Sequence, residues 1–424
     1  MPGKKKDMAD AYTMRPISEG EFRAFFAVIE HAFHAHHPAS AEMQHDLPVF
    51  EFDRSLAALD GAEIVGTSGV LSLHMTVPGG TAPVAGVTAI ATAPAHRRRG
   101  ILTSLMHGQL ADIRDRGEAI AALFATEAGI YGRFGFGAAT SELSLTIRRG
   151  EGALLAQAPA PGPLRLRVAE PRDARSELAR VFEPVLRERP GMYARDDRWW
   201  ENALWDPEHR RSGSTPLRCL IAEDGAGPRG YAVYSVRSAW NDDGIPEGVL
   251  RIRELMASDP AAYVAIWNDL LSRDLVDEVR ADARPVDEPL LFLLADRRRA
   301  RPRLVDALWV RLVSVPEALA GRRYSCPVDV VIEVTDDLFS ENVGRWRLRA
   351  PGRGGGDERA TCERTSAAAD VTLPVQSLGA AYMGGTTLGA LARAGLAEEA
   401  RPGAIAALST AMSWEPAPWS PTVF

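Results

Sequence analysis

A chain of 424 residues is too long for one ordinary hydrophobic core, so its length predicts two or three domains. The composition, 46% hydrophobic and 25% charged, is that of a soluble globular protein, and the net charge of −7 argues against a nucleic-acid surface while remaining compatible with cationic small substrates. No apolar run is long enough to span a membrane, and the start MPGKKKDMAD lacks the apolar segment of a signal peptide, which predicts a cytoplasmic protein.

The three cysteines lack the spacing that a zinc site or a disulfide framework requires. Cys219, Cys326 and Cys362 are widely separated, and their number is odd. We therefore expect them to be apolar core residues.

The first predicted elements are a helix and a hairpin. The pattern SEGE from Ser18 to Glu21 is a capping box, and the aromatic and apolar residues from Phe22 to Phe33 recur at helical spacing. The strand-like stretch AEIVGTSGVLSLHMTVPGG then ends in a Pro-Gly-Gly turn that returns the chain into a second strand at residues 84–92.

A glycine after three arginines joins this strand to the next predicted helix. A buried strand is predicted at residues 83–94, PVAGVTAIATAP, and the loop PAHRRRGIL follows it. A helix that ends near Gly117 is predicted for ILTSLMHGQLADIRDRG. Because the first N–H groups of a helix have no partner within it and Gly100 has no Cβ, a phosphate can approach closely, and Arg97, Arg98 and Arg99 supply permanently charged donors. The similar run DRRRARPR, residues 296–303, lacks a glycine and is expected to be surface charge.

The remaining elements predict two further units. The first unit continues with a predicted buried strand, EAIAALFAT, a short helix and loop, EAGIYGRFGF, and a further strand, ATSELSLTIRR. A predicted linker, GEGALLAQAPAPGPL, follows this strand. A second unit echoes the first, but its strand-to-helix corner is Ser258-Asp259-Pro260, whose N-cap would repel a phosphate. A third unit of alternating strands and a glycine-interrupted helical region precedes the tail SWEPAPWSPTVF, in which three prolines favour extended structure.

Two of these motifs resemble a known family. VTAIATAPAHRRRGIL resembles the acetyl-coenzyme A signature of the GCN5-related N-acetyltransferases (GNATs), and ATEAGIYGRFGFGAAT is similar to a segment of the Eis (enhanced intracellular survival) acetyltransferases. The likeness covers nearly the whole chain, although Leu102 replaces the last small residue of the general signature. It implies an α/β (α+β) fold: a catalytic GNAT domain (1–150), a degenerate second GNAT domain (151–315) and a sterol-carrier-protein-like domain whose tail enters the active site (316–424).

The resemblance also implies a cofactor site. The backbone of Ile90, Ala91 and Thr92 would pair with the pantetheine arm, and the arginine loop would hold the pyrophosphate. The full set of implied acetyl-coenzyme A residues is Ile90, Ala91, Thr92, Arg97, Arg98, Arg99, Gly100, Ile101 and Thr126.

Two groups match the family's catalytic positions. Tyr131 matches its general acid, and a tyrosine of pKa about 10 can protonate a leaving thiolate at neutral pH. The alternative is a tyrosine that is simply packed in the core. Phe424 would place the chain's terminal carboxylate in the active site, where a pKa of about 3.5 favours proton removal through a water molecule. The alternative is a frayed, solvated chain end.

The resemblance implies fewer residues for the pocket that binds the amine substrate. Phe33, Thr88 and Ala89 fall where the resembled enzymes line their substrate pocket, but HAFHAHHPAS around Phe33 has no carboxylate to hold a cationic aminoglycoside. His31, His34 and His37 lack a fourth ligand, so no metal site is expected, and histidines at a pocket mouth are the favoured interpretation. Trp199, Trp200 and Trp205 are interpreted as core or interface residues.

The resulting hypothesis is an enzyme that transfers acetyl directly, in a ternary complex, from acetyl-coenzyme A to a primary amine of a small molecule such as an aminoglycoside or a polyamine. The alternatives are a protein lysine N-acetyltransferase and a module that binds coenzyme A or an apolar ligand without turnover. The resemblance also implies a homo-hexamer. No nucleic-acid partner and no membrane span are expected.

Overall fold

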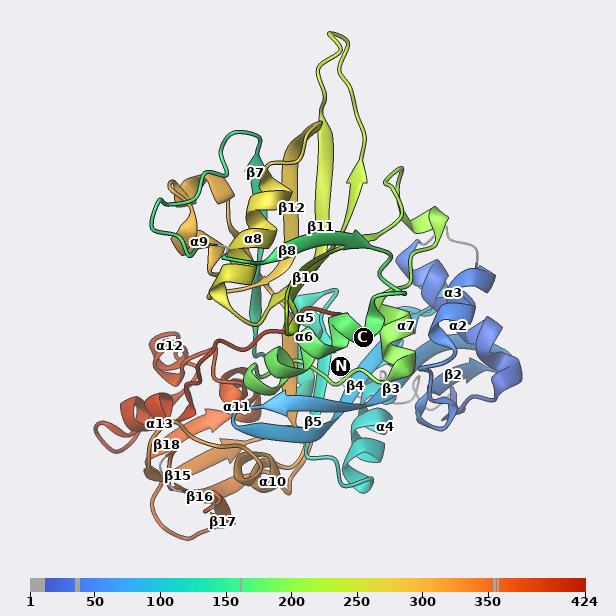
Figure 1. Cartoon of the computed structure of the whole chain (residues 1–424). Coiled ribbons are helices and arrows are strands. Elements are labelled where there is room, and N and C mark those ends of the chain that lie inside the picture. The colour runs from blue at the N-terminus through green and yellow to red at the C-terminus, as the bar shows by residue number, and fades with distance from the viewer. Residues whose placement is uncertain (1–11, 35–38, 161, 354–355, 357) are drawn as a thin grey trace. The chain divides into compact units, whose positions relative to one another are not determined.

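The structure is a computed structural model that describes residues 12–34, 39–160, 162–353, 356 and 358–424. The chain divides into two compact units, of which the first holds residues 1–139, 308–414 and 424, and the second holds residues 140–307 and 415–423. Each unit therefore combines segments that lie far apart in the sequence. Figure 1 colours these segments by residue number.

The first unit contains a seven-stranded sheet. Its strands, in spatial order, are β1 (Thr13–Pro16), β2 (Leu56–Asp60), β3 (Glu63–Val77), β4 (Gly80–Thr92), β5 (Ile120–Phe124), β14 (Leu308–Leu312) and β6 (Gly137–Ala138). Its helices are α2 (Phe22–Phe33), α3 (Ala39–Asp46), α4 (Ile101–Asp115) and α5 (Ala128–Tyr131). β4 and β5 form a parallel pair, and the β3–β4 hairpin is antiparallel.

The first helix and the hairpin agree with the sequence prediction. The Glu21 carboxylate accepts hydrogen bonds from the backbone N–H and the hydroxyl of Ser18, both at 2.9 Å, which fixes the chain just before α2. Phe25 and Val28 bury their side chains against the sheet, as the helical spacing predicted. α4 likewise begins directly after Gly100, and Gly117 follows it with a φ of 75°.

The second unit contains its own seven-stranded sheet. The strands, in spatial order, are β13 (Arg303–Asp306), β7 (Ser141–Arg148), β12 (Val276–Pro285), β11 (Gly248–Ala257), β10 (Gly227–Arg237), β9 (Arg218–Asp224) and β8 (Arg165–Ala169). The helices are α6 (Arg175–Glu188), α7 (Asp197–Ala203), α8 (Pro260–Leu271) and α9 (Leu290–Leu293). Asp259 accepts a hydrogen bond from the N–H of Ala262 at 2.9 Å, so the predicted acidic cap of α8 is present.

Two strands are exchanged relative to their order in the sequence. β7 follows the elements of the first sheet along the chain, yet it pairs with β12 and β13 in the second sheet. β14 follows the elements of the second sheet, yet it pairs with β5 and β6 in the first. The sequence analysis placed the strand at residues 139–149 in the first domain, whereas in the structure β7 pairs within the second sheet and β14 is the antiparallel partner of β5.

A third, five-stranded sheet belongs to the first unit. Its strands are β17 (Thr361–Arg364), β16 (Gly344–Ala350), β15 (Val328–Thr335), β18 (Val371–Pro374) and β19 (Glu398–Glu399), and its helices are α10 (Val315–Ala320), α11 (Val375–Tyr382), α12 (Leu388–Arg393) and α13 (Ala404–Met412). α11 packs against β14 and β6 of the first sheet. The approach is close because a Cβ on Gly379 would come within 2.3 Å of the Val310 carbonyl oxygen.

Within the part of the chain that the structure describes, no helix is both long enough and apolar enough to cross a membrane. Cys219 and Cys362 are buried and Cys326 is partly buried, and all three are free thiols.

Candidate active site

The site begins at an irregularity in β4. Thr67 of β3 pairs with Ala91, whereas Gly69 pairs with Thr88, so β4 carries one extra residue between these pairs. Ala89 adopts a left-handed φ of 52°, and its carbonyl oxygen accepts a hydrogen bond from the Thr67 hydroxyl at 2.8 Å. This β-bulge re-aims the backbone of the predicted cofactor strand.

The bulge separates β4 from β5. The two parallel strands pair only at Ala85 with Ala121 and at Gly86 with Ala122. Beyond Gly86, the edge of β4 that faces β5, which includes Ile90 to Thr92, has no strand partner among the described residues. An unpaired strand edge beside a parallel neighbour can receive the amide groups of an extended ligand, as in strand addition by peptides.

The arginine loop joins this strand to α4. Arg98 and Gly100 both have left-handed backbones, with φ of 64° and 90°. The N–H groups of Arg98 through Thr103 have no acceptor within the described chain. Such a run of unpaired N–H groups at a helix N-terminus forms an anion-binding concavity.

The arginine side chains of this loop differ in their contacts. Arg97 donates to the carbonyl oxygen of Ala32 at 3.3 Å, which links the loop to the last turn of α2, and Arg99 donates to the Tyr12 hydroxyl at 3.3 Å. Arg98 is exposed and has no hydrogen-bond or ion-pair partner in the described residues. Ile101 buries its side chain under the sheet, so only its backbone faces the loop.

Tyr131 ends the short helix that follows β5. Its side chain is 5% exposed and packs edge-on against Phe136, with ring centroids 6.4 Å apart. Burial raises the pKa of the Tyr131 hydroxyl, a hydrogen bond with the Thr126 side chain lowers it, and the Glu127 carboxylate raises it, with a net shift upward. The phenol therefore remains a proton donor at neutral pH.

The C-terminal residue lies where β4 and β5 separate. An oxygen of the Phe424 carboxylate accepts a hydrogen bond from the Thr88 hydroxyl at 3.2 Å. The Phe424 ring meets Phe124 of β5 at 5.2 Å between centroids, and a Cβ on Gly86 would come within 3.0 Å of this ring. Phe424 therefore contacts both strands on its side of the separation, through Thr88 and Gly86 of β4 and through Phe124 of β5.

The other predicted pocket residues lie on neighbouring elements. Thr88 and Ala89 belong to the bulged part of β4, and Phe33, the last residue of α2, is 48% exposed. His31 and His34 are exposed, while His37 lies outside the described residues. In the described part of the chain, no group of His, Cys, Asp and Glu could hold a metal ion.

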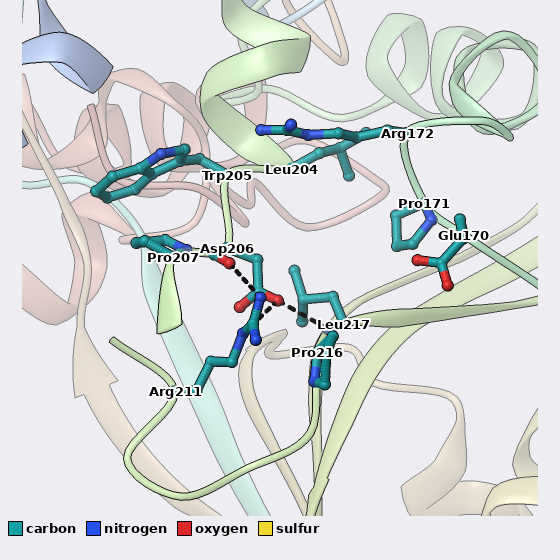
Figure 2. Close-up of a pocket in the computed structure, with 10 residues that line it drawn as sticks. All are labelled: Glu170, Pro171, Arg172, Leu204, Trp205, Asp206, Pro207, Arg211, Pro216 and Leu217. Atoms are coloured by element: carbon teal, nitrogen blue, oxygen red, sulfur yellow. Dashed lines mark hydrogen bonds and ion pairs between the residues drawn. The ribbon is translucent and has the colours of Figure 1, made fainter. Parts of the chain in front are cut away.

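A cavity of about 370 Å³ lies elsewhere, within the second unit. Trp205 lines it, whereas Trp199 and Trp200 are buried, as expected for core residues. Figure 2 shows Asp206 in its wall, accepting hydrogen bonds from Arg211 at 3.0 Å and from the Leu217 N–H at 2.9 Å. None of the predicted site residues lines this cavity.

Three features of the site were missed from the sequence. An alanine gives no warning of a left-handed bulge, because glycine is the usual signal for that conformation. Gly86 was also not singled out, although a Cβ there would come within 2.7 Å of the Leu73 side chain and 3.0 Å of the Phe424 ring. Residues 415–423 are held within the second unit, where the Trp419 N–H donates to the Pro190 carbonyl oxygen at 2.8 Å, and no sequence motif marks such contacts.

Comparison with known proteins matches all three parts of the chain. Residues 13–139 and 191–312 each match a family model described as an acetyltransferase (GNAT) domain, and residues 315–421 match a sterol carrier protein domain. An uncharacterized N-acetyltransferase of Streptomyces avermitilis is 41% identical over 97% of this chain and 99% of its own length. The N-acetyltransferase Eis of Mycobacterium tuberculosis is 35% identical over 79% of each chain.

Solved structures agree with these matches. The crystal structure of Eis1 from Mycobacterium abscessus is 33% identical and superposes with a TM-score of 0.80, covering 97% of this chain and 100% of its own. A GCN5-related N-acetyltransferase from Anabaena variabilis is only 19% identical but has a TM-score of 0.82, again over 97% of this chain and 100% of its own. The second comparison supports the shared fold alone.

Proposed function

The chain belongs to the Eis-like acetyltransferases of the GCN5-related superfamily, and we propose that it transfers an acetyl group from acetyl-coenzyme A to a primary amine of a small molecule. The N-terminal GNAT domain carries the reaction. The observation that carries the proposal is the combination of a splayed strand pair with an open anion loop at the next helix.

The shape of this site fits the two ends of coenzyme A. The unpaired edge of β4 from Ile90 to Thr92 offers backbone groups to the amides of the pantetheine arm, and the N–H groups of the Arg98 to Thr103 segment offer donors to its pyrophosphate. Arg98 adds a guanidinium that no described residue neutralises. The thioester then lies near the point where the two strands separate.

In this proposal the substrate amine attacks the thioester carbonyl while both substrates are bound. A C–N bond forms, the C–S bond breaks, and the departing sulfur takes the hydroxyl proton of Tyr131. The proton lost by the amine passes through a water molecule to the Phe424 carboxylate. This assignment is supported by the raised pKa of Tyr131 and by the position of Phe424 beside Thr88.

The substrate class follows from the few polar groups on the acceptor side. The surface on the acceptor side is formed by Phe33, Thr88 and Ala89, and its only polar side-chain group is the Thr88 hydroxyl. Such a surface does not favour a polycationic aminoglycoside over a polyamine or an arylamine. The nearest acidic residue along α2 is Glu30, whose Oε1 is enclosed and unpaired within the described residues. We propose that the acceptor is a small amine with one principal cationic group.

Release of free coenzyme A thiol from acetyl-coenzyme A tests the proposal, with aminoglycosides, polyamines, arylamines and lysine peptides as acceptors. Release that depends on small amines with one cationic group supports the proposal and names the substrate class. Release only with polycationic aminoglycosides or polyamines would keep the acetyl transfer but overturn the proposed acceptor class. Release only with lysine peptides would instead indicate a protein acetyltransferase, and binding without any release would indicate a non-catalytic module. Light scattering of the purified protein tests the accompanying proposal of a homo-hexamer.

A further inference from the structure

The second unit repeats the strand geometry of the proposed cofactor site. β11 and β12 are a parallel pair, as β4 and β5 are, and their pairing ends at Ile252 and Ala281. β11 also carries an extra residue, Arg253, because Val233 of β10 pairs with Glu254 while Tyr234 pairs with Ile252. The second unit therefore has its own bulge and its own separation of parallel strands.

The junction between β11 and α8 is not suited to bind an anion. The Asp259 carboxylate caps α8 at the position where Gly100 precedes α4 in the first unit, and Pro260 removes one of the N–H donors. A negative charge already fixed there repels a pyrophosphate. This unit has kept the strand geometry but not the phosphate loop.

The chain's own tail fills the space between the separated strands. The Trp419 indole N–H donates to the carbonyl oxygen of Ala283, at the far end of β12, at 2.7 Å. Its ring is 3% exposed and belongs to the same apolar cluster as Met256 of β11. Arg284 bridges the two strands by donating to the Leu255 carbonyl oxygen at 2.9 Å, and its guanidinium lies 5.2 Å from the Trp419 ring.

The backbone on both sides of Trp419 is held as well. Trp419 N–H donates to Pro190 O at 2.8 Å, and Gly191 permits this approach because a Cβ there would come within 3.0 Å of Trp419 O. Two residues earlier in the tail, the N–H and carbonyl of Ala417 bond to Asp287 and Arg189, at 3.1 and 2.9 Å.

The last anchor is only two residues from the chain end. Arg195 donates to the Thr422 hydroxyl at 2.5 Å and forms a two-pronged ion pair with Glu254, at 2.6 and 3.1 Å. The Arg195 side chain is 2% exposed, and its guanidinium stacks 4.3 Å from the ring of Phe182. Burial opposes the charge on Glu254, but Arg195 outweighs it and lowers the pKa of that carboxyl. Thr422 is therefore hydrogen-bonded to a rigid, charged group.

We propose that the second GNAT domain has exchanged its cofactor cleft for a tail socket, formed by Ala283, Arg284, Gly191 and Arg195, which positions the C-terminal carboxylate for catalysis. Two residues of extended chain span at most about 7 Å, so a fixed Thr422 limits how far the Phe424 carboxylate can move. Trp419 and Thr422 are positioning residues. The inference rests on the proposed function only in assigning a catalytic role to that carboxylate.

The test compares Thr422→Val, which removes the acceptor hydroxyl at nearly constant volume, with Thr422→Ser, which keeps it. The exposed neighbour supplies the matched control Val423→Thr. We expect Thr422→Val to lower kcat by about tenfold, because a hydrogen bond to a charged group is lost, with KM for acetyl-coenzyme A unchanged. Thr422→Ser and Val423→Thr should retain wild-type kcat.

A second readout does not depend on acetyl transfer. Carboxypeptidase A removes an accessible C-terminal phenylalanine, and mass spectrometry follows the loss of Phe424 and Val423. Thr422→Val should be trimmed faster than the wild type and Thr422→Ser at the wild-type rate. Trp419→Phe, which loses the N–H donor, should also be trimmed faster, whereas the exposed Trp240→Phe should not.

The two readouts separate the possible failures. Wild-type trimming of both Thr422→Val and Trp419→Phe overturns the socket. Faster trimming with an unchanged kcat overturns the positioning role. If no amine is acetylated by the wild type, the proposed function fails, and the trimming rates still decide whether the socket holds the tail.

Discussion

The Thr88 hydroxyl lies 3.2 Å from an oxygen of the Phe424 carboxylate, although 336 positions of sequence separate the two residues. Thr88 belongs to the bulged part of β4, whose other residues form the edge proposed for the pantetheine arm. The same short segment therefore serves the cofactor through its backbone and the chain end through a side chain. A change in the bulge should affect both functions together.

The Thr88–Phe424 hydrogen bond gives the first prediction. Thr88→Val removes the donor and keeps the branched shape, so the carboxylate loses one of its fixed contacts. We expect kcat to fall about five- to tenfold, in line with one hydrogen bond to a charged group, while the Kd for acetyl-coenzyme A stays unchanged. Steady-state kinetics with thiol detection measure it, and Thr88→Ser should restore kcat. A Thr88→Val enzyme with wild-type kcat would remove this contact from the mechanism.

Tyr131 gives a prediction about pH. A general acid works only while it is protonated, so activity should persist up to the raised pKa of Tyr131 and be lost as the pH rises through it, above about pH 10. Tyr131→Phe should lower kcat by about 10²- to 10⁴-fold and abolish this alkaline limb, with acetyl-coenzyme A binding retained. The Thr126 hydrogen bond lowers the pKa of Tyr131, so Thr126→Val should move the limb to higher pH. If kcat of Tyr131→Phe still fell at the same alkaline pH, another group would be the general acid.

The two arginine runs give a matched pair of variants. Arg98 and Arg298 are both exposed arginines in runs of three, but only Arg98 lies beside unpaired N–H groups at the start of a long helix. Arg98→Ala should weaken acetyl-coenzyme A binding about tenfold, and the loss should shrink as salt screens the charge. Calorimetric titration at two salt concentrations measures this. Equal affinities for Arg98→Ala and Arg298→Ala would show that the charge of the loop does not contribute.

The sequence predicted the local parts of this site better than their assembly. The α2 helix, the hairpin and the glycine before α4 carry strong local signals, which are phenylalanine spacing, a Pro-Gly-Gly turn and a strand that meets a helix. The exchange of β7 and β14 has no such signal, because the alternation of β7 suits either sheet and β14 is a short strand buried along its whole length. The bulge at Ala89 and the anchoring of Trp419 depend on contacts between distant segments, which one sequence does not reveal.

The interior of the first unit also contains a long-range contact that the sequence does not predict. Arg311 of β14 has a fully buried side chain, and it donates to the Asp336 carboxylate at 2.6 Å. That carboxylate also accepts from the N–H groups of Leu338 and Phe339 and from the Asn342 amide. The ion pair ties the exchanged strand to the third sheet, and nothing in the sequence around β14 marks it.

Because this pair is buried, breaking it should destabilise the protein strongly. Asp336→Asn leaves the Arg311 charge without a counter-charge and should lower the free energy of unfolding by about 3–5 kcal/mol, as measured by urea titration. The exposed pair Arg345–Glu333, at 3.4 Å, is the control, and Glu333→Gln should change that free energy by less than about 1 kcal/mol. β14 borders β5, which precedes Tyr131, so Asp336→Asn should also lower the acetyltransferase activity that survives at moderate temperature. Equal stabilities for the two variants would mean that the buried pair does not hold the exchanged strand in place.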